Sequence, residues 1–473
     1  MEKEVLINEE EPPSQPYPIL ESMPGPGVLP PGETFPPLTS LAPHEGLFKT
    51  DSVVQKLWPG VTTEEWNDWR WQMANRVRTI DNLSLLLNLK PYQISRYKRL
   101  IEYFHFAITP YYLSLIDWSN PDDPVRKQSV PDLKELEFQI IGDNDPLEEE
   151  EDMQVAGLVH RYPDRVLAVV TNTCSMYCRH CTRKRIWHEG ESERSKKELK
   201  AMVDYIRSTS GVREVVVSGG DPLTMNIDLL DWFLGELQRI SHIEVLRIGT
   251  RVPAVLPMRI TDDLVSMLSR HRPLWLNTQF NHPREITPEV QEACDKIQRA
   301  GIPISNQSVL LRGVNDSLEV MKELCHALQR IMVRPYYLYQ CDPVRGVEHF
   351  RTNLWKGIEI IEMMRGYTGG LCVPTFVVDA PGGGGKIPLQ PFYLLSVSEK
   401  DVILRNYEGM IIKYFNPQES DFGRPKKANG NGKDGGTAQL IKGTVKALVP
   451  EETVRYKRRK QKNLLFKAKD DRV

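Results

Sequence analysis

Three cysteines with C-x3-C-x2-C spacing are the clearest candidates for chemistry in this sequence. Cys174, Cys178 and Cys181 follow an apolar, β-branched run at 165–171, which predicts a buried strand that ends in a loop. Three thiolates can bind three irons of a [4Fe–4S] cube, whereas a closed cluster takes four. The spacing therefore predicts a [4Fe–4S] cluster with one iron left open for another ligand.

Two other interpretations of these cysteines remain open. Zinc could be bound by the three thiolates together with His180, although His180 directly precedes Cys181 and simultaneous coordination would be strained. Disulfides are a weaker alternative, because three clustered cysteines cannot pair evenly and the chain has seven in total. The strand-then-loop context favours the iron–sulfur interpretation.

Lys386 is the second chemical candidate, because it follows four consecutive glycines at 382–385. A phosphate loop would need glycine at 380 and serine or threonine at 387, where Ala380 and Ile387 stand. A lysine on a glycine-rich strap suits imine formation with an aldehyde cofactor, since the strap lets the amine swing aside. A surface turn with an exposed lysine is the alternative.

Arg161, Tyr162 and Arg165 stand just before the first predicted strand. Arginine guanidinium groups bind phosphate through paired hydrogen bonds. Together with Lys386 these residues predict a pyridoxal phosphate site, although Arg165 could instead form a surface salt bridge. Adjacent glycines at 219–220, after the second predicted strand, would permit close approach of a ligand to the backbone.

An alternation of strand and helix patterns must position these groups. Apolar runs at 165–171, 214–218, 243–248, 274–279, 303–311 and 334–340 alternate with helix-length patterns near 195–209, 227–240, 261–270, 287–299, 317–330 and 352–365. This order predicts parallel strands joined by right-handed crossovers. Six units predict an α/β fold that is a partial (β/α)6 TIM-like barrel, with its chemistry at the carboxyl ends of the strands.

Four segments are expected. Residues 1–49 are rich in Pro and Glu and predict a disordered tail. Residues 50–160 predict a helical region in which Thr62 or Thr63 caps a helix. Residues 161–400 form the barrel core, and 401–473 form an extension with a Gly/Lys linker and a basic tail.

Two charged runs are interpreted as solvated. The acidic residues at 148–152 suit a solvated loop. The basic run at 455–462 is expected to be solvated as well, with RNA or an acidic partner surface as the alternative ligand.

Composition limits the class of protein. A net charge of −2 over 473 residues gives no global reason to expect nucleic acid or membrane binding. No apolar run approaches the ~20 residues that span a bilayer, and the acidic N-terminus lacks the apolar core of a secretory signal. Seven cysteines, three of them clustered, suit a reducing compartment, so the predicted location is cytoplasmic.

The combination of motifs resembles the lysine 2,3-aminomutase family of radical S-adenosylmethionine enzymes, which also use pyridoxal phosphate. Besides the three cysteines, the similarity rests on residues 161–165, 218–223, 280–283, 311–316, 334–337, 340–342 and 379–386. It implies an isomerase in which an S-adenosylmethionine-derived radical allows the α-amino group of L-lysine to move from C2 to C3, giving L-β-lysine.

The resemblance also implies roles for individual residues. Lys386 would carry the pyridoxal phosphate, whose phosphate would be held by Arg161, Tyr162 and Arg165. S-adenosylmethionine would be contacted by Ser218, Gly219, Gly220, Asp221, Gln279 and Gln307. Arg183 would bind the substrate carboxylate, and Asp342 and Asp379 would receive its distal cation, a pair that related glutamate enzymes replace with Lys and Asn.

Two departures from the family pattern stand out. Gln279 occupies a position where the family commonly has histidine, and it can still donate and accept hydrogen bonds. Ser317 and the cysteine-free stretch 415–440 replace the cysteines of an intersubunit zinc site. A zinc-free subunit contact is therefore expected in the homo-oligomer that the resemblance implies.

Partners and alternative functions follow from the same reading. The expected partners are a small amino acid substrate and a one-electron reductant such as flavodoxin or ferredoxin. Arginine or another cationic amino acid is the alternative substrate. A protein-modifying or RNA-binding module on the same barrel is the alternative function.

Overall fold

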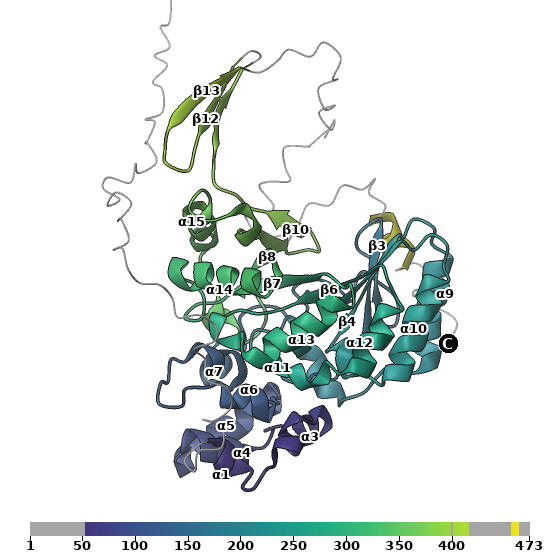
Figure 1. Cartoon of the computed structure of the whole chain (residues 1–473), viewed down its shortest axis with the longest axis vertical. Helices are drawn as coiled ribbons and strands as arrows, with labels where there is room; N and C mark the ends of the chain where they lie inside the picture. Colours follow the sequence, from purple (N-terminus) through teal and green to yellow (C-terminus); the bar gives the residue numbers. More distant parts are fainter. Residues whose placement is uncertain (1–52, 399–400, 416–455, 463–473) are drawn as a thin grey trace, which may run out of the picture. The chain divides into compact units, whose positions relative to one another are not determined.

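The computed structural model describes residues 53–398, 401–415 and 456–462 (Figure 1). The tail predicted at 1–49 and most of the linker and tail beyond 415 lie outside the described residues. No helix in the described residues has the length and apolar character needed to cross a membrane.

The first part of the described chain is helical, as predicted. Thr62 is the N-cap of α2: its side chain accepts a hydrogen bond from the Glu65 amide, and Glu65 binds back to the Thr62 amide in a capping box. The helices of this part are α1 (Val53–Leu57), α2 (Thr63–Asn67), α3 (Trp69–Ala74), α4 (Ile80–Leu87), α5 (Pro91–Tyr103), α6 (Pro110–Ser114), α7 (Pro124–Ser129) and α8 (Lys134–Glu137).

A ten-stranded sheet with the order β1 to β10 follows. Its strands are β1 (Met153–Val155), β2 (Leu158–Val159), β3 (Arg165–Thr171), β4 (Glu214–Gly219), β5 (Val245–Gly249), β6 (Leu274–Thr278), β7 (Ile304–Leu310), β8 (Arg334–Gln340), β9 (Thr375–Ala380) and β10 (Gly385–Pro388). Neighbours from β3 to β9 pair in parallel, while β1, β2 and β10 add antiparallel edges.

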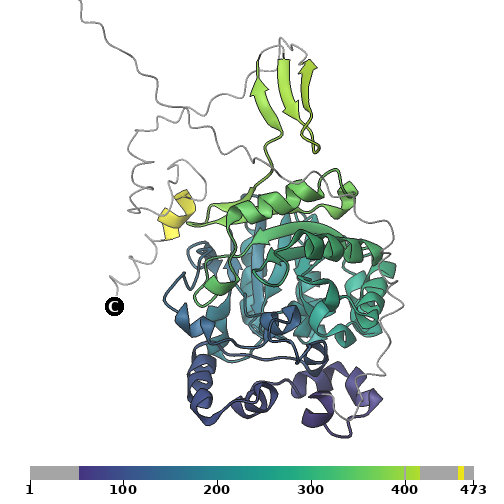
Figure 2. The same cartoon turned by 90° about the vertical axis from the view of Figure 1, so that its left-hand side faces the viewer.

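Helices connect the parallel strands and cover the outside of the sheet. They are α9 (Lys196–Arg207), α10 (Ile227–Gln238), α11 (Val252–Val255), α12 (Asp262–Ser269), α13 (Pro288–Arg299), α14 (Leu318–Arg330) and α15 (Leu354–Met364). Figure 2 shows the same layers from the side. In α10 the buried side chains recur at helical spacing, so the helix has one apolar face that packs against the sheet. These side chains are Leu230, Phe233, Leu234 and Leu237.

The six predicted β/α units and the α/β fold class are confirmed. The sheet order ends at β1 and β10, which do not pair with each other, so the barrel is open. A seventh parallel strand, β9, follows the six predicted ones, and its antiparallel partner β10 carries Lys386. The two strands flank the glycine–lysine motif, and neither strand was among the six that the sequence predicted.

Two smaller elements follow the barrel. Strands β11 (Leu394–Val397), β12 (Asp401–Arg405) and β13 (Ile411–Phe415) form a separate antiparallel sheet. Residues 456–462, within the basic run, form a short helix, drawn in yellow in Figure 1.

Candidate active site

A cavity of about 660 Å³ occupies the interior of the open barrel and reaches the carboxyl ends of its strands. It brings together every residue that the sequence nominated. The sixteen residues are Arg161, Tyr162, Arg165, Cys174, Cys178, Cys181, Arg183, Ser218, Gly219, Gly220, Asp221, Gln279, Gln307, Asp342, Asp379 and Lys386. Their individual roles stay predictions, but their convergence makes one site out of motifs spread over more than 200 residues.

The cysteine loop is fixed by the glycines at the end of β4. The Gly220 amide donates to the Thr171 carbonyl at 2.6 Å, and the Asp221 amide donates to the Thr173 carbonyl at 2.8 Å. A Cβ atom on Gly220 would lie 2.3 Å from the Thr173 oxygen, too close for any side chain. The glycine pair is therefore required for backbone packing just before Cys174, in addition to any contact with a ligand.

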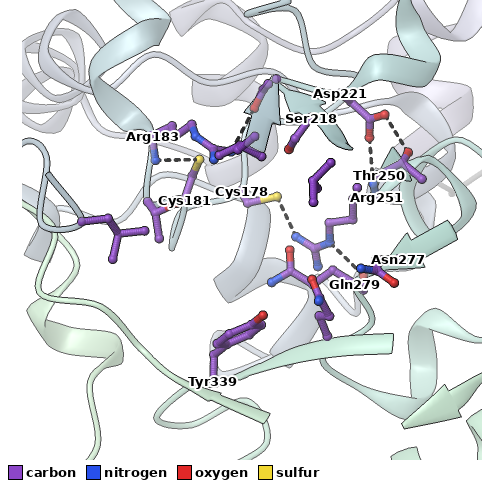
Figure 3. Close-up of a pocket in the computed structure, with 18 of the residues that line it drawn as sticks. Cys178, Cys181, Arg183, Ser218, Asp221, Thr250, Arg251, Asn277, Gln279 and Tyr339 are labelled. Carbon is purple, nitrogen blue, oxygen red and sulfur yellow. Dashed lines mark hydrogen bonds between the residues drawn. The ribbon is translucent and has the colours of Figure 1, made fainter. Parts of the chain in front are cut away.

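Asp221 connects the ends of β4 and β5. Its carboxylate accepts hydrogen bonds from the Thr250 hydroxyl at 2.6 Å and from the amides of Arg251 and Val252 at 2.8 and 3.1 Å (Figure 3). Burial raises the pKa of Asp221 to about 6, against the opposing effect of these donors. Asp221 thus positions the loop after β5 at the cavity wall.

Two of the three thiols contact basic residues. The Sγ atom of Cys178 lies 2.8 Å from Nη1 of Arg251, and Sγ of Cys181 accepts a hydrogen bond from the Arg183 amide at 3.3 Å (Figure 3). Burial raises the pKa of Cys181 to about 11, with Cys178 adding to the shift. Iron coordination would offset this preference for the neutral thiol, because metal-bound thiols are deprotonated.

The donor set fits an iron–sulfur cluster. All three thiols come from one loop and line the cavity. In the described part of the chain, no three Cys, His, Asp or Glu side chains lie close enough together to hold a single metal ion. A cluster does not require such convergence, since each thiolate binds its own iron.

His180 is not oriented as a fourth ligand. Its Nε2 lies 3.2 Å from the Gln279 side-chain nitrogen and 3.3 Å from that of Asn281. Both amides are donors, so the lone pair that zinc would use accepts hydrogen bonds. Burial lowers the pKa of His180 well below its usual range, which keeps the ring neutral.

Arg251 was missed by the sequence reading. Its guanidinium contacts Cys178, Gln128 at 2.6 Å and Glu285 at 2.7 Å. Burial disfavours its charge, but Cys178 and Glu285 outweigh burial and raise the pKa of Arg251. The available signal was its place directly after a strand, where a barrel carries its chemistry.

Lys386 stands at the end of the glycine-rich strap, which is the turn of the β9–β10 hairpin. Gly382, Gly383 and Gly385 have φ values of 69°, 63° and 78°, which other residues rarely adopt. The Lys386 amide donates to the Tyr162 hydroxyl at 3.1 Å, and its Nζ lies 3.0 Å from Oδ2 of Asp379. The Lys386 amine therefore lies at the cavity, while 33% of the side chain stays exposed.

The predicted phosphate-binding residues adjoin this lysine. Arg161 donates through Nε to Asp152 at 3.0 Å, and its Nη1 lies 3.8 Å from Oδ1 of Asp379. The Arg165 guanidinium stacks on the Tyr162 ring at 3.8 Å and pairs with Asp164 at 2.8 Å. Both the site role and the salt bridge expected for Arg165 are compatible with this geometry.

Asp342 and Asp379 face the same space. Burial, together with Asp379, raises the pKa of Asp342 to about 7, while Lys386 opposes the shift. Tyr339 stands beside them, and burial together with Asp379 raises its phenol pKa well above the ordinary value. This acidic, partly desolvated pocket favours a cation.

Arg183 is held by a carboxylate that the sequence reading placed in a solvated loop. Glu149 accepts from Nε of Arg183 at 2.9 Å and from Nη2 at 2.6 Å. Burial favours a higher pKa for Glu149, but Arg183 and Arg185 outweigh it and lower this pKa to about 2. The solvated-loop interpretation is wrong for Glu149 and Asp152, which are 4% and 1% exposed.

Comparison with known families agrees with this site. Residues 168–325 match the Radical SAM superfamily, and residues 361–472 match a family described as Lysine-2,3-aminomutase. The match to the radical superfamily begins within β3 and includes the cysteine loop.

Curated relatives cover most of the chain. An L-lysine 2,3-aminomutase of Acetoanaerobium sticklandii is 53% identical over 371 residues, which are 78% of this chain and 90% of the relative. An L-lysine 2,3-aminomutase of Bacillus subtilis is 52% identical over 363 residues, 77% of each chain. A glutamate 2,3-aminomutase of Clostridioides difficile is 45% identical over 352 residues, 74% of this chain and 83% of the relative.

These matches confirm the expected cofactors. A radical S-adenosylmethionine domain implies a [4Fe–4S] cluster and S-adenosylmethionine, and the lysine 2,3-aminomutase homologues depend on pyridoxal phosphate. The cysteine loop, the basic and aromatic residues near Lys386 and the shared cavity fit these groups. The chain belongs to the lysine 2,3-aminomutase family of radical S-adenosylmethionine enzymes.

Proposed function

We propose that this enzyme converts L-lysine to L-β-lysine by moving the α-amino group from C2 to C3. Family membership alone leaves the substrate open, because a glutamate 2,3-aminomutase is also a relative. The observation that carries the proposal is the acidic pair Asp342 and Asp379, which faces the cavity beside Lys386.

The charge of this pair selects for a cation. In the structure the Lys386 ammonium lies 3.0 Å from Asp379 and lowers the pKa of Asp342 against the effect of burial. When the Lys386 nitrogen is used to bind the aldehyde cofactor, another cation is needed near the two carboxylates. The ε-ammonium of lysine supplies it, whereas the side chain of glutamate would add a third negative charge.

Other residues of the cavity would hold the remaining groups. Arg183 would bind the substrate carboxylate through its guanidinium fork, which Glu149 occupies in the structure. Arg161, Tyr162 and Arg165 would hold the cofactor phosphate, and Ser218, Gly219, Gly220, Asp221, Gln279 and Gln307 would face S-adenosylmethionine.

The protein's share of the reaction is positioning and exclusion of water. When bound, the cluster and S-adenosylmethionine supply a carbon radical, and pyridoxal phosphate supplies a π system that delocalises an unpaired electron. The barrel walls, including Tyr339 and the loop at 174–181, would keep the reacting atoms together within the cavity.

A competition assay tests the substrate. Lysine, arginine and glutamate are offered together to the reconstituted enzyme under anaerobic conditions with a chemical reductant, and the β-amino products are separated by mass. We expect preferential formation of β-lysine. Preferential turnover of glutamate would contradict the argument from the acidic pair. Preferential turnover of arginine would retain the cation argument and replace lysine as substrate, because a guanidinium also pairs with two carboxylates.

We further propose a setting for this activity. A one-electron reductant such as flavodoxin or ferredoxin would supply electrons to the cluster. A cytoplasmic location suits seven cysteines that form no disulfide in the described residues. A homo-oligomer is proposed from family membership alone, and Ser317 with the cysteine-free stretch 415–440 supports a subunit contact without zinc. The segment boundaries at 49, 160 and 400 remain our proposal.

A further inference from the structure

We propose that the basic helix at 456–462 is a positioning element of the active site: Arg459 holds Asp152, and Asp152 holds Arg161. The contact between the helix at 456–462 and the acidic segment 148–152 is observed directly in the structure. Its consequence for the cofactor phosphate rests on the role proposed above for Arg161.

Arg459 makes the central contacts of this helix. Its Nε donates to Oδ1 of Asp152 at 3.0 Å, and its Nη1 donates to Glu148 at 2.9 Å. Around it, Lys462 donates to the Glu150 carbonyl at 2.7 Å. Asp152 and Glu148 raise the pKa of Arg459 against the effect of partial burial, so the charge is kept at the contact.

Asp152 divides its carboxylate between the helix and the site. Its side chain is 1% exposed; Oδ1 accepts from Arg459, and Oδ2 accepts from Nε of Arg161 at 3.0 Å. Removal of one guanidinium leaves part of this buried carboxylate without its charged partner, which is unfavourable. Removal of Arg459 should therefore make Asp152 and its hold on Arg161 less well ordered.

The ion pairs continue from Arg161 to the reactive lysine. Nη1 of Arg161 lies 3.8 Å from Oδ1 of Asp379, and Oδ2 of Asp379 lies 3.0 Å from Nζ of Lys386. The backbone carbonyl of Arg161 is also 3.5 Å from Nη2 of Arg458. A series of charges thus joins the C-terminal helix to the cavity.

The acidic segment 148–152 explains why the helix is basic. Glu148 and Asp152 bind the helix, whereas Glu149 binds Arg183 inside the cavity. The acidic surface that the sequence analysis gave as an alternative ligand of the basic run is therefore present in the same chain. The basic run thus contributes Arg459, which holds Asp152 next to Arg161. The solvated-tail interpretation is wrong for Arg459.

Matched charge removals test the proposal in the full-length protein. Arg459→Gln removes the part-buried contact with Asp152, and Lys460→Gln removes the same charge from an exposed position on the same helix. Hydrogen–deuterium exchange is followed at 148–152 and at 456–462. We expect faster exchange at both segments in Arg459→Gln and no change in Lys460→Gln.

Cofactor titration gives the second measurement. Arg459→Gln should weaken pyridoxal phosphate binding by roughly tenfold, equivalent to about 1.4 kcal/mol, and leave the affinity for pyridoxal, which lacks the phosphate, within about twofold. The iron–sulfur absorbance should not change. Equal weakening for both ligands would contradict a role through Arg161.

The two proposals can fail separately. Unchanged exchange in Arg459→Gln, in an enzyme that makes β-lysine, would overturn the positioning role and leave the proposed function intact. Faster exchange and weaker phosphate binding in a chain that acts on another amino acid would support the positioning role while replacing the proposed substrate.

Discussion

Lys386 and Asp379 are direct partners across the antiparallel β9–β10 pair, and Nζ of Lys386 lies 3.0 Å from Oδ2 of Asp379. Directly opposed residues place their side chains on the same face of a sheet. The hairpin geometry, set by its glycine turn, therefore brings the amine and a carboxylate together before any ligand binds. The carboxylate proposed to receive the substrate cation also holds the lysine proposed to carry the cofactor.

Replacement of Lys386 tests this double relationship. Lys386→Ala should lose the visible absorbance of the lysine-bound cofactor and all mutase activity, because no amine remains to bind the aldehyde. The iron–sulfur spectrum should be retained, since the cysteine loop follows a different strand. Lys356→Ala, on α15 with a side chain that is 42% exposed, is the control. An unchanged cofactor band in Lys386→Ala would assign the covalent role to another residue.

Much of this architecture was predictable because its signals are local. The run 165–171 coincides with β3, and the glycine–lysine motif coincides with the β9–β10 turn. Apolar periodicity and φ requirements act over a few residues, and the sequence displays them directly.

The unpredicted parts are pairings of distant charges. Glu149 with Arg183 and Asp152 with Arg459 join residues 34 and 307 positions apart. An acidic run has the same sequence pattern whether it meets solvent or a guanidinium, so only the tertiary placement distinguishes the two. The same holds for Arg251, whose contact with Cys178 depends on how β5 lies beside the cysteine loop.

Loss of one cysteine should abolish the radical chemistry. Cys174→Ala leaves two thiolates, which are too few to retain the cube, so anaerobic reconstitution should yield little iron and no 5′-deoxyadenosine. Cys294→Ala, a buried cysteine on α13 outside the cavity, is the control. Formation of 5′-deoxyadenosine by Cys174→Ala would contradict the assignment of the cluster ligands.

Glu149 should stabilise the fold through its ion pairs. Its pKa of about 2 lies below the ordinary 4.5, so the folded state favours the ionised form. The stabilisation, at most about 3 kcal/mol for a shift of this size, is present above pH 4.5 and is lost as pH falls through 2. Glu149→Gln should lower the free energy of unfolding at pH 7, and its difference from the native chain should shrink below pH 4.5.

Chemical unfolding of the two chains across this pH range measures the effect. Glu151→Gln, an exposed neighbour in the same acidic segment, should change stability by less than about 0.5 kcal/mol. Equal effects of the two substitutions would indicate that the Arg183 contact contributes little.

The acidic pair should determine selectivity for lysine. Asp342→Asn and Asp379→Asn should each lower kcat/KM for lysine by tenfold or more, about 1.4 kcal/mol of transition-state stabilisation. Both substitutions keep the size of the side chain and remove one charge. Asp263→Asn, exposed on α12, provides the control. A loss below twofold in both variants would place the substrate cation elsewhere in the cavity.

The pH dependence of lysine use should report on Asp342. Burial, together with Asp379, raises the pKa of Asp342 to about 7, so the carboxyl is largely protonated at pH 6 and ionised at pH 8. The ε-ammonium pairs with the ionised form, and binding of this cation should release a proton.

We expect kcat/KM for lysine to rise as pH increases through 7. Asp342→Asn should flatten this rise as well as lower the plateau, because its amide does not titrate. The same profile measured with reconstituted Asp263→Asn should match the native enzyme. A rise through pH 7 that persists in Asp342→Asn would assign the titration to another group.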